Sequence, residues 1–565
     1  MMKLTGAEII VRTLIEQGAT DVFGYPGGQV INIYDALYKY RDEINHILTA
    51  HEQGAAHAAD GYSRATGKVG VCIATSGPGA TNLVTGIATA MLDSIPMVAI
   101  TGNVPCSLIG KDSFQEIDIT GITLPITKHN YFVHKIEDLA DSIREAFSIA
   151  KSGRPGPVLV DVPKDVQMAT YDYEPMPIVP KIPLPHAKDE DIAKAIELIN
   201  EAKRPYVYIG GGAAGLGLGK EIVEFAEKID AYIGCSFMGL SAVNEECDRF
   251  LGMQGMHGKY ASSVAQNNAD LIIGVGVRFS DRATGNVKKF AKNSKIIQLD
   301  PDFAEINKNI VVDCGIVGDV EHSFRTIAAA VEKKDNPEWK EFVESLKAEG
   351  KRIEAEIEKK DKSPITPKKL FEVINRTKPE GTVIATDVGQ HQMWTAQYAK
   401  FDRPRRIVSS GGLGTMGFGL GAAIGARVAT GDTVVLITGD GSFGMNLNEL
   451  ATAVTYNIPV VIVLLNNGVL GMVRQWQTLF FGKRYSNTVL ADRKTDFVKL
   501  ADAFGAVGYR VFDIESFERA FTSALKADGP VVIDVAIDKD EFVLPMLPPG
   551  GSVDDIITDV KREEN

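Results

Sequence analysis

Hydrophobic residues in this chain form short β-branched runs that alternate with longer segments of helical periodicity. The clearest example is an apolar run at residues 433–438, which ends in the tripeptide GDG (439–441) and leads into a helical segment. A second apolar run at residues 459–465 follows and is closed by Asn466 and Asn467. This pattern predicts a strand, a glycine-rich turn, a helix and a second strand. Parallel strands connected in this way bring both turns close together at the carboxyl edge of one sheet.

The N-terminal part of the chain has the same alternation. An amphipathic helix is predicted at its start, with a capping box from Thr5 to Glu8 and Gly18 at its end. The apolar run at residues 44–50 then predicts a strand, and a helix opens at His51-Glu52.

The middle of the chain carries a glycine-rich motif. Residues 205–209 predict a strand, and the GGGAAG that follows at 210–215 fits the pattern GxGxxG, with Asp230 fifteen residues beyond its last glycine. Taken alone, this motif leaves a dinucleotide site and a structural glycine-rich turn equally open.

Two stretches of unusual composition divide the chain. Residues 166–188 contain five prolines and predict an extended connection. Residues 332–367 are highly charged and predict a solvated helix that crosses between domains. We therefore expect α/β domains at residues 1–170, 188–335 and 364–545, followed by a C-terminal tail at 546–565.

The first and third domains are related by an internal repeat. Sliding the chain by 364 residues superimposes residues 58–82 on 422–446 with ten of 25 positions identical. The separation is too long for a solenoid, so we expect two related domains around a different middle. At the position of Asp440 the first copy has Ser76, so only the C-terminal copy carries this carboxylate. The predicted fold class is α/β, with three doubly wound parallel-sheet domains.

Composition and charge narrow the functional classes. A chain of 565 residues with 45% hydrophobic content has room for several domains with large cores. The net charge of −13, without a long basic tract, argues against nucleic acid or an anionic membrane as a partner. No apolar run is long enough to span a membrane, and the N-terminus does not resemble a signal peptide. The five cysteines are scattered without a CxxC motif, as expected for free thiols in the cytoplasm.

The two predicted turns of the C-terminal segment offer ligands for a metal and an anion. Asp440 supplies a carboxylate and Asn467 a side-chain carbonyl, and such hard oxygen ligands suit Mg²⁺ together with phosphate oxygens. The glycines allow a ligand to approach the backbone closely. A lone GDG is often only a strand-to-helix turn, but here 24 residues separate Gly441 from Asn466. GDG followed by NN at this distance resembles the thiamine diphosphate (ThDP) binding motif.

Glu52 is the candidate partner of this cofactor. By itself, a carboxylate in a first helical turn is explained by the helix macrodipole. ThDP, however, needs a carboxylic acid that hydrogen-bonds to N1′ of its pyrimidine, so that the 4′-amino group can act as a base. The resemblance to ThDP enzymes implies that Glu52 and the GDG segment come from different subunits, which makes a dimer the smallest active unit.

Ten ordered motifs extend the resemblance over nearly the whole chain. They are FGYPGG (23–28), HEQGAAHAADGYSRATG (51–67), TSGPGATN (75–82), FQE (114–116), TKHN (127–130), GRPGPVLVDVPKDV (153–166), GMHG (255–258), VGQHQMW (388–394), GLGTMGFGLGAAIGA (412–426) and GMVRQWQ (471–477). Together they resemble the catalytic subunit of the acetohydroxyacid synthase (acetolactate synthase) family, of the biosynthetic, FAD-containing kind. Two positions depart from the family pattern, Gln29 in place of a common alanine and Ser280 within RFSDR in place of RFDDR.

The resemblance implies roles for individual residues at the ThDP site. Glu52 activates the cofactor, the Gly414 carbonyl accepts from the 4′-amino group, and Met416 enforces the bent cofactor conformation, although a methionine there is equally explained as core filler. Mg²⁺ is held by Asp440, Asn467 and the backbone carbonyl of Val469. The other residues implied at this cofactor are Tyr25, Pro26, Pro78, Asn82, Val388, Gly389, Gln390, His391, Gly439, Gly441, Ser442, Leu470, Gly471 and Met472.

It also implies residues for the substrates and for FAD. Arg282 receives the carboxylate of the second 2-ketoacid as a planar fork, and Trp476 forms a wall that favours the extra methyl group of 2-ketobutyrate, although an ordinary buried aromatic is the alternative. Phe114 and Met472 complete the substrate site, and Gly27, Gly28, Gln115 and Lys128 line the reacting centre. The residues implied for FAD are Arg154, Gly211, Gly212, Met256, His257, Arg278, Arg282, Asp300 and Asp319.

The implied activity is the decarboxylation of pyruvate and transfer of its two-carbon unit to a second 2-ketoacid, for branched-chain amino acid synthesis. Partners implied by the family are a homodimer or homotetramer and a small regulatory subunit. Two related enzymes are alternatives: a catabolic, FAD-free acetolactate synthase, and a pyruvate oxidase that uses ThDP and FAD. A non-catalytic dinucleotide-binding sensor has only the GxGxxG motif in its support.

Overall fold

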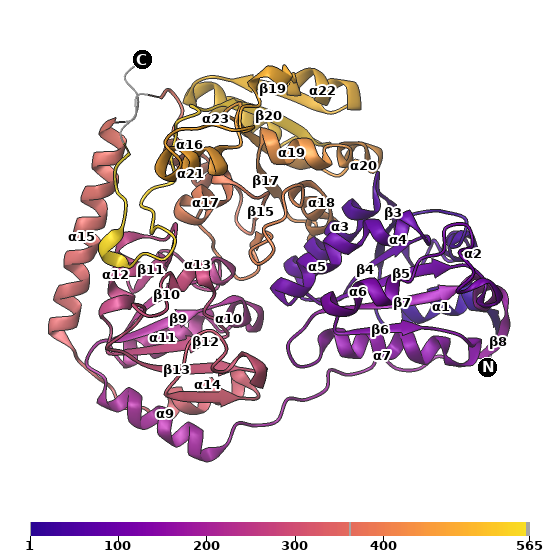
Figure 1. Cartoon of the computed structure of the whole chain (residues 1–565), viewed down its shortest axis with the longest axis horizontal. Coiled ribbons are helices and arrows are strands. Elements are labelled where there is room, and N and C mark those ends of the chain that lie inside the picture. Colours follow the sequence, from indigo (N-terminus) through magenta and orange to yellow (C-terminus); the bar gives the residue numbers. More distant parts are fainter. Residues whose placement is uncertain (1, 361–362, 561–565) are drawn as a thin grey trace.

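The computed structural model describes residues 2–360 and 363–560, and it contains three six-stranded parallel sheets flanked by helices (Figure 1). The N-terminal sheet has the order β3-β2-β4-β5-β7-β6. Its strands are β2 (Asp21–Tyr25), β3 (Asn45–Leu48), β4 (Gly70–Ala74), β5 (Met97–Asn103), β6 (His129–Phe132) and β7 (Pro157–Pro163). Its helices are α1 (Gly6–Glu16), α2 (Ile31–Lys39), α3 (Glu52–Thr66), α4 (Pro78–Asn82), α5 (Val84–Asp93), α6 (Ile119–Thr123), α7 (Leu139–Lys151) and α8 (Lys164–Met168). A separate antiparallel pair joins β1 (Met2–Thr5) to β8 (Thr170–Tyr173).

The central sheet has the order β11-β10-β9-β12-β13-β14. Its strands are β9 (Pro205–Ile209), β10 (Tyr232–Cys235), β11 (Phe250–Met253), β12 (Leu271–Val275), β13 (Lys295–Asp300) and β14 (Cys314–Val317). Its helices are α9 (Asp189–Glu201), α10 (Gly211–Leu216), α11 (Gly219–Lys228), α12 (Tyr260–Asn268), α13 (Asp281–Thr284) and α14 (Val320–Ala330).

The C-terminal sheet has the order β16-β15-β17-β18-β20-β19, which repeats the order of the N-terminal sheet strand for strand. Its strands are β15 (Val383–Thr386), β16 (Ile407–Val408), β17 (Val434–Gly439), β18 (Val460–Asn466), β19 (Val507–Val511) and β20 (Val531–Ala536). Its helices are α16 (Pro367–Thr377), α17 (Gln390–Tyr398), α18 (Gly419–Thr430), α19 (Asp440–Asn446), α20 (Glu449–Thr455), α21 (Gly471–Phe480), α22 (Phe497–Phe504) and α23 (Ile514–Ala524). The predicted fold class and the kinship of the first and third domains are confirmed.

The two related domains pack against each other through equivalent helices, α3 and α18. A Cβ atom on Gly61 would overlap the carbonyl oxygen of Ala422, and one on Gly425 would overlap that of Ala58. Ala58 and Gly61 are the repeat equivalents of Ala422 and Gly425, so each helix makes the same contact with the other. This reciprocity is the property of a two-fold interface, here formed within one chain.

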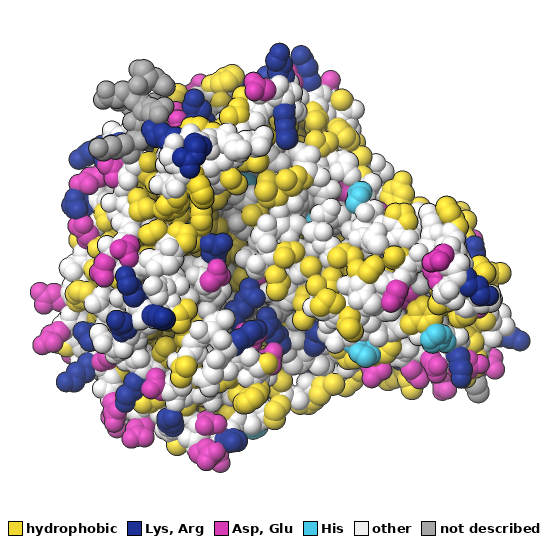
Figure 2. Space-filling view, viewed as in Figure 1, with side chains coloured by type: hydrophobic (Ala, Val, Ile, Leu, Met, Phe, Trp, Pro, Cys, Tyr) yellow, Lys and Arg dark blue, Asp and Glu magenta, His cyan; other side chains and the backbone are white. Residues whose placement is uncertain are grey.

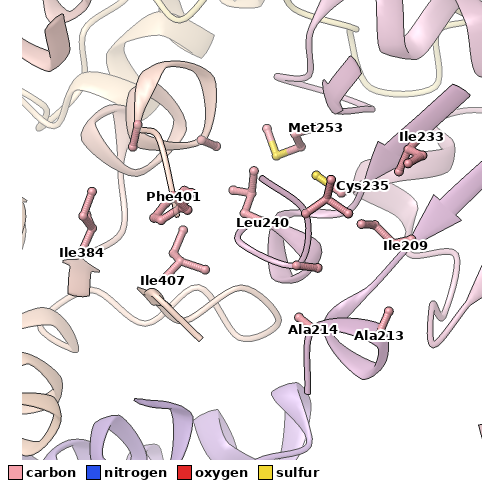
Figure 3. Packing of buried hydrophobic residues seen from close by; sticks show 14 of the residues in the cluster. Ile209, Ala213, Ala214, Ile233, Cys235, Leu240, Met253, Ile384, Phe401 and Ile407 are labelled. Carbon is pink, nitrogen blue, oxygen red and sulfur yellow. The ribbon is translucent and has the colours of Figure 1, made fainter. Parts of the chain in front are cut away.

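The central and C-terminal domains share one hydrophobic core. Figure 3 shows Leu240 and Met253 of the central domain facing Phe401 and Ile407 of the C-terminal domain, and all four side chains are buried. Helix α15 (Pro337–Lys360) lies along the outside of both domains (Figure 1).

The predicted helix in the charged stretch is confirmed as α15, but it is only partly solvated. Trp339, Val343, Leu346 and Ile353 are buried on one face of the helix. Three of them join a core cluster with strands of the central domain, which explains why this charged helix is stable.

The structure also bears on the predictions for the first helix, the proline-rich connection, the cysteines and membrane spans. The capping box of Thr5 and Glu8 is present at α1, and residues 174–188 run without regular secondary structure between β8 and α9. All five cysteines are free. Among residues 2–360 and 363–560, no helix is both long enough and apolar enough to cross a membrane.

Candidate active site

The carboxyl ends of β15, β17 and β18 lie side by side in the C-terminal sheet and carry one group of predicted residues. Gly389 and the first turn of α17 follow β15, Asp440 follows β17, and Asn467 follows β18. Because the three strands are parallel neighbours, their loops open at the same edge of the sheet. The βαβ prediction is therefore correct, except that its helix is divided into α19 and α20.

Close contacts join these three loops. The Asn467 amide donates to Gln390 Oε1 at 3.3 Å, and a Cβ atom on Gly471 would overlap the same oxygen. A Cβ atom on Gly439 would lie 3.0 Å from His391 Nδ1. These glycines leave no space for a side chain, so the loops close into a cradle of backbone and amide groups.

Met416 belongs to the same cradle. A Cβ atom on Gly441 would lie 2.7 Å from Leu470 Cδ2 and 3.9 Å from the Met416 methyl group. The predicted residues from four separate segments are thus in mutual contact.

Burial changes the electrostatics of the cradle. Desolvation raises the pKa of Asp440 to about 6, against hydrogen bonds from backbone amides that include that of Gly441. Burial also lowers the pKa of His391 to about 3, so its imidazole is neutral at pH 7. A carboxylate in such surroundings is stabilised by a nearby cation.

The cradle fits a divalent cation with a diphosphate. The Asp440 carboxylate and the Asn467 amide oxygen are hard donors of the kind that Mg²⁺ prefers, and both side chains are only partly buried. Within the described part of the chain, His391 Nε2 is buried without a hydrogen-bond partner, so this atom is available to a bound ligand.

The loop before α18 carries Gly414, which is exposed and has a φ of +70°. The base of this loop is held by Asp387, which accepts hydrogen bonds from the amides of Gly417 at 2.7 Å and Val388 at 3.1 Å. Burial raises the pKa of Asp387 to about 6. Sequence reasoning missed Asp387, because it lies one residue before a predicted motif and its partner Gly417 is 30 residues away in the chain.

The equivalent edge of the N-terminal sheet carries the second group of predicted residues. Glu52 is the first residue of α3, and its carboxylate accepts from the Asn82 amide at 2.9 Å. A Cβ atom on Gly79, in the helix that begins at Pro78, would lie 3.2 Å from Glu52 Oε1.

Other residues predicted for this edge are close by. Gly27 lies against Thr75, and Gly77 packs on Gln115, whose φ of +62° is unusual for a residue with a side chain. Gly28 has open space where its side chain would be, and Tyr25 is exposed. This edge of the sheet is therefore open to solvent at Tyr25 and Gly28.

Helix α20 links this edge to the C-terminal domain. Glu449 is fully buried, and its Oε2 accepts from the backbone amide of Ala50 at 3.1 Å, immediately before α3. No motif pointed to Glu449 in the sequence, and its contact with the segment before Glu52 depends on packing between two domains.

Two predicted residues are placed differently from the rest. Lys128 Nζ donates to the carbonyl oxygens of Ile149 and Ser152, both at 2.5 Å, where it caps the end of α7. Burial lowers the pKa of Lys128 to about 8. Phe114 is 84% exposed and extends into solvent. Neither side chain contacts Glu52 in this conformation of the chain.

The two main candidate substrate residues are neighbours. The Arg282 guanidinium lies 6.0 Å from the centre of the Trp476 ring, and its Nη1 is 3.5 Å from Met256 Sδ. Trp476 also packs against the C-terminal segment around Phe542 and Met546. A cation beside an aromatic wall is thus formed by the central domain and α21 together.

Two of the residues predicted for FAD, Gly211 and Gly212, lie at the amino end of α10. Gly211 begins this helix, and a Cβ atom on Gly212 would lie 2.8 Å from Gly276 Cα. Arg278 Nη2 would lie 2.8 Å from a Cβ atom on Gly412, which brings the central domain against the loop that carries Gly414. Figure 2 shows lysine and arginine side chains gathered in the hollow where the domains meet.

The remaining members of this group have structural partners. Arg154 donates to Glu305 at 2.5 Å and to Ser94 at 2.7 Å, and the Asp319 side chain caps α14. Burial raises the pKa of Asp300 to about 6 and lowers that of His257 to about 4. Within the described residues, His257 Nδ1 is buried without a partner.

Three family models match the chain in order. They describe the N-terminal TPP binding domain of thiamine pyrophosphate enzymes over residues 4–122, the central domain over 192–327, and the C-terminal TPP binding domain over 387–535.

Individual relatives match over nearly their full length. The probable acetolactate synthase large subunit of Methanocaldococcus jannaschii is 46% identical, over 99% of this chain and 96% of its own length. The acetolactate synthase isozyme 2 large subunit of Escherichia coli is 45% identical, over 97% of this chain and 98% of its own. The isozyme 3 large subunit of the same organism is 42% identical, over 98% and 99%.

Proposed function

This chain belongs to the acetolactate synthase large subunits, a family of thiamine diphosphate enzymes, and from this we propose that it makes 2-acetolactate from pyruvate. The enzyme decarboxylates pyruvate and transfers the remaining two-carbon unit to a second 2-ketoacid. A pyruvate acceptor gives 2-acetolactate, and a 2-ketobutyrate acceptor gives 2-aceto-2-hydroxybutyrate. Each reaction releases one CO₂ without net oxidation or reduction, and the products lead to valine, leucine and isoleucine.

The observation that carries the proposal is the pair of complementary half-sites on two related domains. One half-site has Glu52 hydrogen-bonded to Asn82 at the edge of the N-terminal sheet. The other has Asp440 and Asn467 in the glycine cradle at the equivalent edge of the C-terminal sheet. A carboxyl group for a pyrimidine and hard oxygens for a metal diphosphate are the two requirements of one cofactor.

When bound, thiamine diphosphate supplies the electron sink that decarboxylation of a 2-ketoacid requires. Glu52 would hold a proton at the pyrimidine N1′, and the Gly414 carbonyl would accept from the 4′-amino group. Asp440, Asn467 and the Val469 carbonyl would hold Mg²⁺, and the segment from Gly389 to His391 would surround the diphosphate.

Arg282 and Trp476 would select the second substrate. A guanidinium binds a carboxylate through two parallel hydrogen bonds, so Arg282 orients the acceptor. Trp476 offers a flat surface to its alkyl group, and one methylene in such a pocket is worth about 1–3 kcal/mol. Gly28, Gln115, Phe114 and Met472 complete the walls around the reacting atoms.

FAD binding by the central domain is part of the proposal. The close approach of Gly212 to Gly276 at the amino end of α10 and the basic hollow around Arg278 support an anionic ligand. Because the reaction involves no net redox change, FAD would have a structural role. Flavin absorbance in the purified protein separates this enzyme from the FAD-free catabolic synthase.

The assembly is proposed on the same basis. The relatives are named large subunits, which supports association with a small regulatory subunit. We propose a homodimer or homotetramer in the cytoplasm, with each active site formed by Glu52 of one subunit and Asp440 of another.

Removal of the metal tests the proposal directly. Dialysis against EDTA is expected to abolish acetolactate formation, and Mg²⁺ and ThDP added together are expected to restore it, because the diphosphate binds through the metal. Acetolactate formation that persists with neither Mg²⁺ nor ThDP added would contradict the proposed dependence on the metal and the cofactor. Peroxide and acetyl phosphate as products would identify a pyruvate oxidase instead.

A further inference from the structure

The loop at residues 409–415, which carries Gly414, is attached to the N-terminal domain of the same chain at two points. The backbone amide of Gly411 donates to Asp93 Oδ2 at 2.9 Å. Four residues further on, the Thr415 and Thr89 hydroxyl oxygens are 2.7 Å apart. Thr89 and Asp93 lie one turn apart on α5, so a single helix face holds both ends of the loop.

The hydroxyl contact has a defined direction. Thr89 is fully buried, and its hydroxyl donates to the carbonyl oxygen of Thr85 at 2.9 Å. Since a hydroxyl has one proton, the Thr415 hydroxyl must donate to Thr89. The amide of Thr415 donates in turn to Ser410 Oγ at 3.0 Å, which closes the loop upon itself.

Asp93 is itself held firmly. Its side chain is buried and pairs with Arg64 Nη2 at 3.0 Å, and Arg64 also pairs with Asp60. Among the described residues, Asp93 Oδ1 has no hydrogen-bond partner, and a Cβ atom on Gly412 would lie 2.8 Å from it. The backbone at 411–412 therefore rests directly on a carboxylate that an ion-pair network keeps in place.

Gly414 has no such support of its own. It is exposed, its φ is +70°, and a Cβ atom there would meet only Val388 Cγ1, at 3.9 Å. Its position therefore depends on its neighbours in the loop, which are held by Thr89 and Asp93 from the N-terminal domain and by Gln392 and Asp387 from the C-terminal domain.

We propose that Thr89 and Asp93 are positioning residues that hold the loop at residues 409–415 so that Gly414 is preorganised for thiamine diphosphate. The inference rests on the proposed role of Gly414 at the cofactor. A loop fixed before binding loses less conformational entropy when the ligand arrives, so its anchors contribute to affinity without touching the ligand.

Calorimetric titration with ThDP and Mg²⁺ tests the threonine contact without requiring turnover. Thr89→Val and Thr415→Val each remove one hydroxyl while keeping the shape, and each is expected to weaken ThDP binding about fivefold, the scale of one neutral hydrogen bond. The double variant is expected to bind ThDP as Thr89→Val does, because that substitution has already broken the bond to Thr415. Fully additive effects of the two substitutions would overturn the proposal.

A matched control separates positioning from stability. Thr13 is equally buried, in α1 of the same domain, and its hydroxyl donates to the carbonyl oxygen of Ile9 at 2.7 Å, away from the loop at residues 409–415. Thr13→Val is expected to lower the thermal unfolding midpoint like Thr89→Val but to leave the ThDP affinity unchanged. A loss of affinity in Thr13→Val equal to that in Thr89→Val would mean that the effect is structural.

The contact of Asp93 with the loop is tested by a separate pair of variants. Asp93→Asn keeps an acceptor for Gly411 but removes the charge that Arg64 holds, and ThDP affinity is expected to fall about tenfold with the KM for pyruvate unchanged. The control is Glu16→Gln, which neutralises the Glu16–Arg144 ion pair elsewhere in this domain. Unchanged ThDP binding by Thr89→Val and Asp93→Asn would refute the positioning role alone. Failure of the unmodified chain to bind ThDP would refute the proposed function.

Discussion

The proposed role of Glu52 depends on the residues around it. A carboxylate in a first helical turn is favoured by the helix dipole alone. In this chain, however, its Oε2 is bonded to Asn82 and Gly79 packs next to its Oε1, so the carboxyl group is oriented as well as favoured. An oriented carboxyl group can hold a proton at a fixed point on a ligand.

Glu52→Gln is therefore expected to reduce the rate of acetolactate formation by about 10²–10⁴-fold, the range of a general acid–base contribution. The amide keeps the size of the side chain and a contact with Asn82, so ThDP binding measured by calorimetry should remain. A variant that makes acetolactate at the normal rate would show that Glu52 does not activate the cofactor.

Single residues also show what sequence can and cannot reveal. Asp440, Asn467 and Glu52 stand at strand ends that the hydrophobic pattern marks, so their positions at sheet edges were predictable. Asp93 and Asp387 were not, because their partners lie far away in the chain and no local pattern connects them. The side chain of Lys128 was predicted at the reacting centre, whereas here it caps α7.

Among the helices, α3 begins with Glu52 and also packs against the C-terminal domain. His57, one turn beyond Glu52, is fully buried against Phe418 of the C-terminal domain, with ring centres 5.2 Å apart. Burial, with smaller effects from Arg64 and His51, lowers the pKa of His57 to about 3. The imidazole is therefore neutral in the folded protein.

This burial makes the packing sensitive to acid. Below the ordinary pKa of 6.5 the unfolded chain binds a proton at His57, whereas the folded chain does not until the pH nears 3. Stability is therefore lost as the pH falls through this window, by up to about 1.4 kcal/mol per pH unit.

His57→Gln is expected to flatten this fall when the free energy of unfolding is measured by urea titration between pH 7 and pH 4. His134→Gln, at an exposed position, serves as the control and should retain the slope of the unmodified chain. Equal slopes for His57→Gln and the unmodified chain would contradict the account of the α3 interface.

For helix α15, the sequence predicted the helix but not the surface on which it packs. Its charge run predicted a helix, but the buried positions Trp339, Val343 and Leu346 show that one face packs on the central domain. Their spacing of four and three residues is helical, so the signal was present in the sequence. The partner of that face was not, since it depends on the tertiary arrangement.

The whole molecule is organised by its internal repeat. Two domains with the same strand order present different carboxylates at equivalent edges, Glu52 on one and Asp440 on the other. The repeat was visible in the sequence, whereas the reciprocal packing of Gly61 and Gly425 follows only from the folded chain. If active sites form between subunits, each chain contributes one half-site to each of two cofactors.

Mixed dimers test this arrangement. Glu52→Gln chains and Asp440→Asn chains, each inactive alone, are unfolded, mixed in equal amounts and refolded. Half of the resulting dimers contain one chain of each kind, and each such dimer has one intact site of two. We therefore expect the mixture to regain about a quarter of full activity. Glu52→Gln mixed with Asn82→Ala should regain none, since both changes damage the same half-site. No recovery in the first mixture would show that each site forms within one chain.

Identification of the products tests whether this chain forms 2-acetolactate from pyruvate. The purified chain is supplied with ThDP, Mg²⁺ and FAD, with pyruvate alone and then with 2-ketobutyrate added. We expect 2-acetolactate first, and then largely 2-aceto-2-hydroxybutyrate. Trp476→Leu should shift the second mixture toward acetolactate about tenfold, within the range of one methylene contact. Acetyl phosphate and peroxide, or no carbon–carbon bond formation, would contradict the assignment.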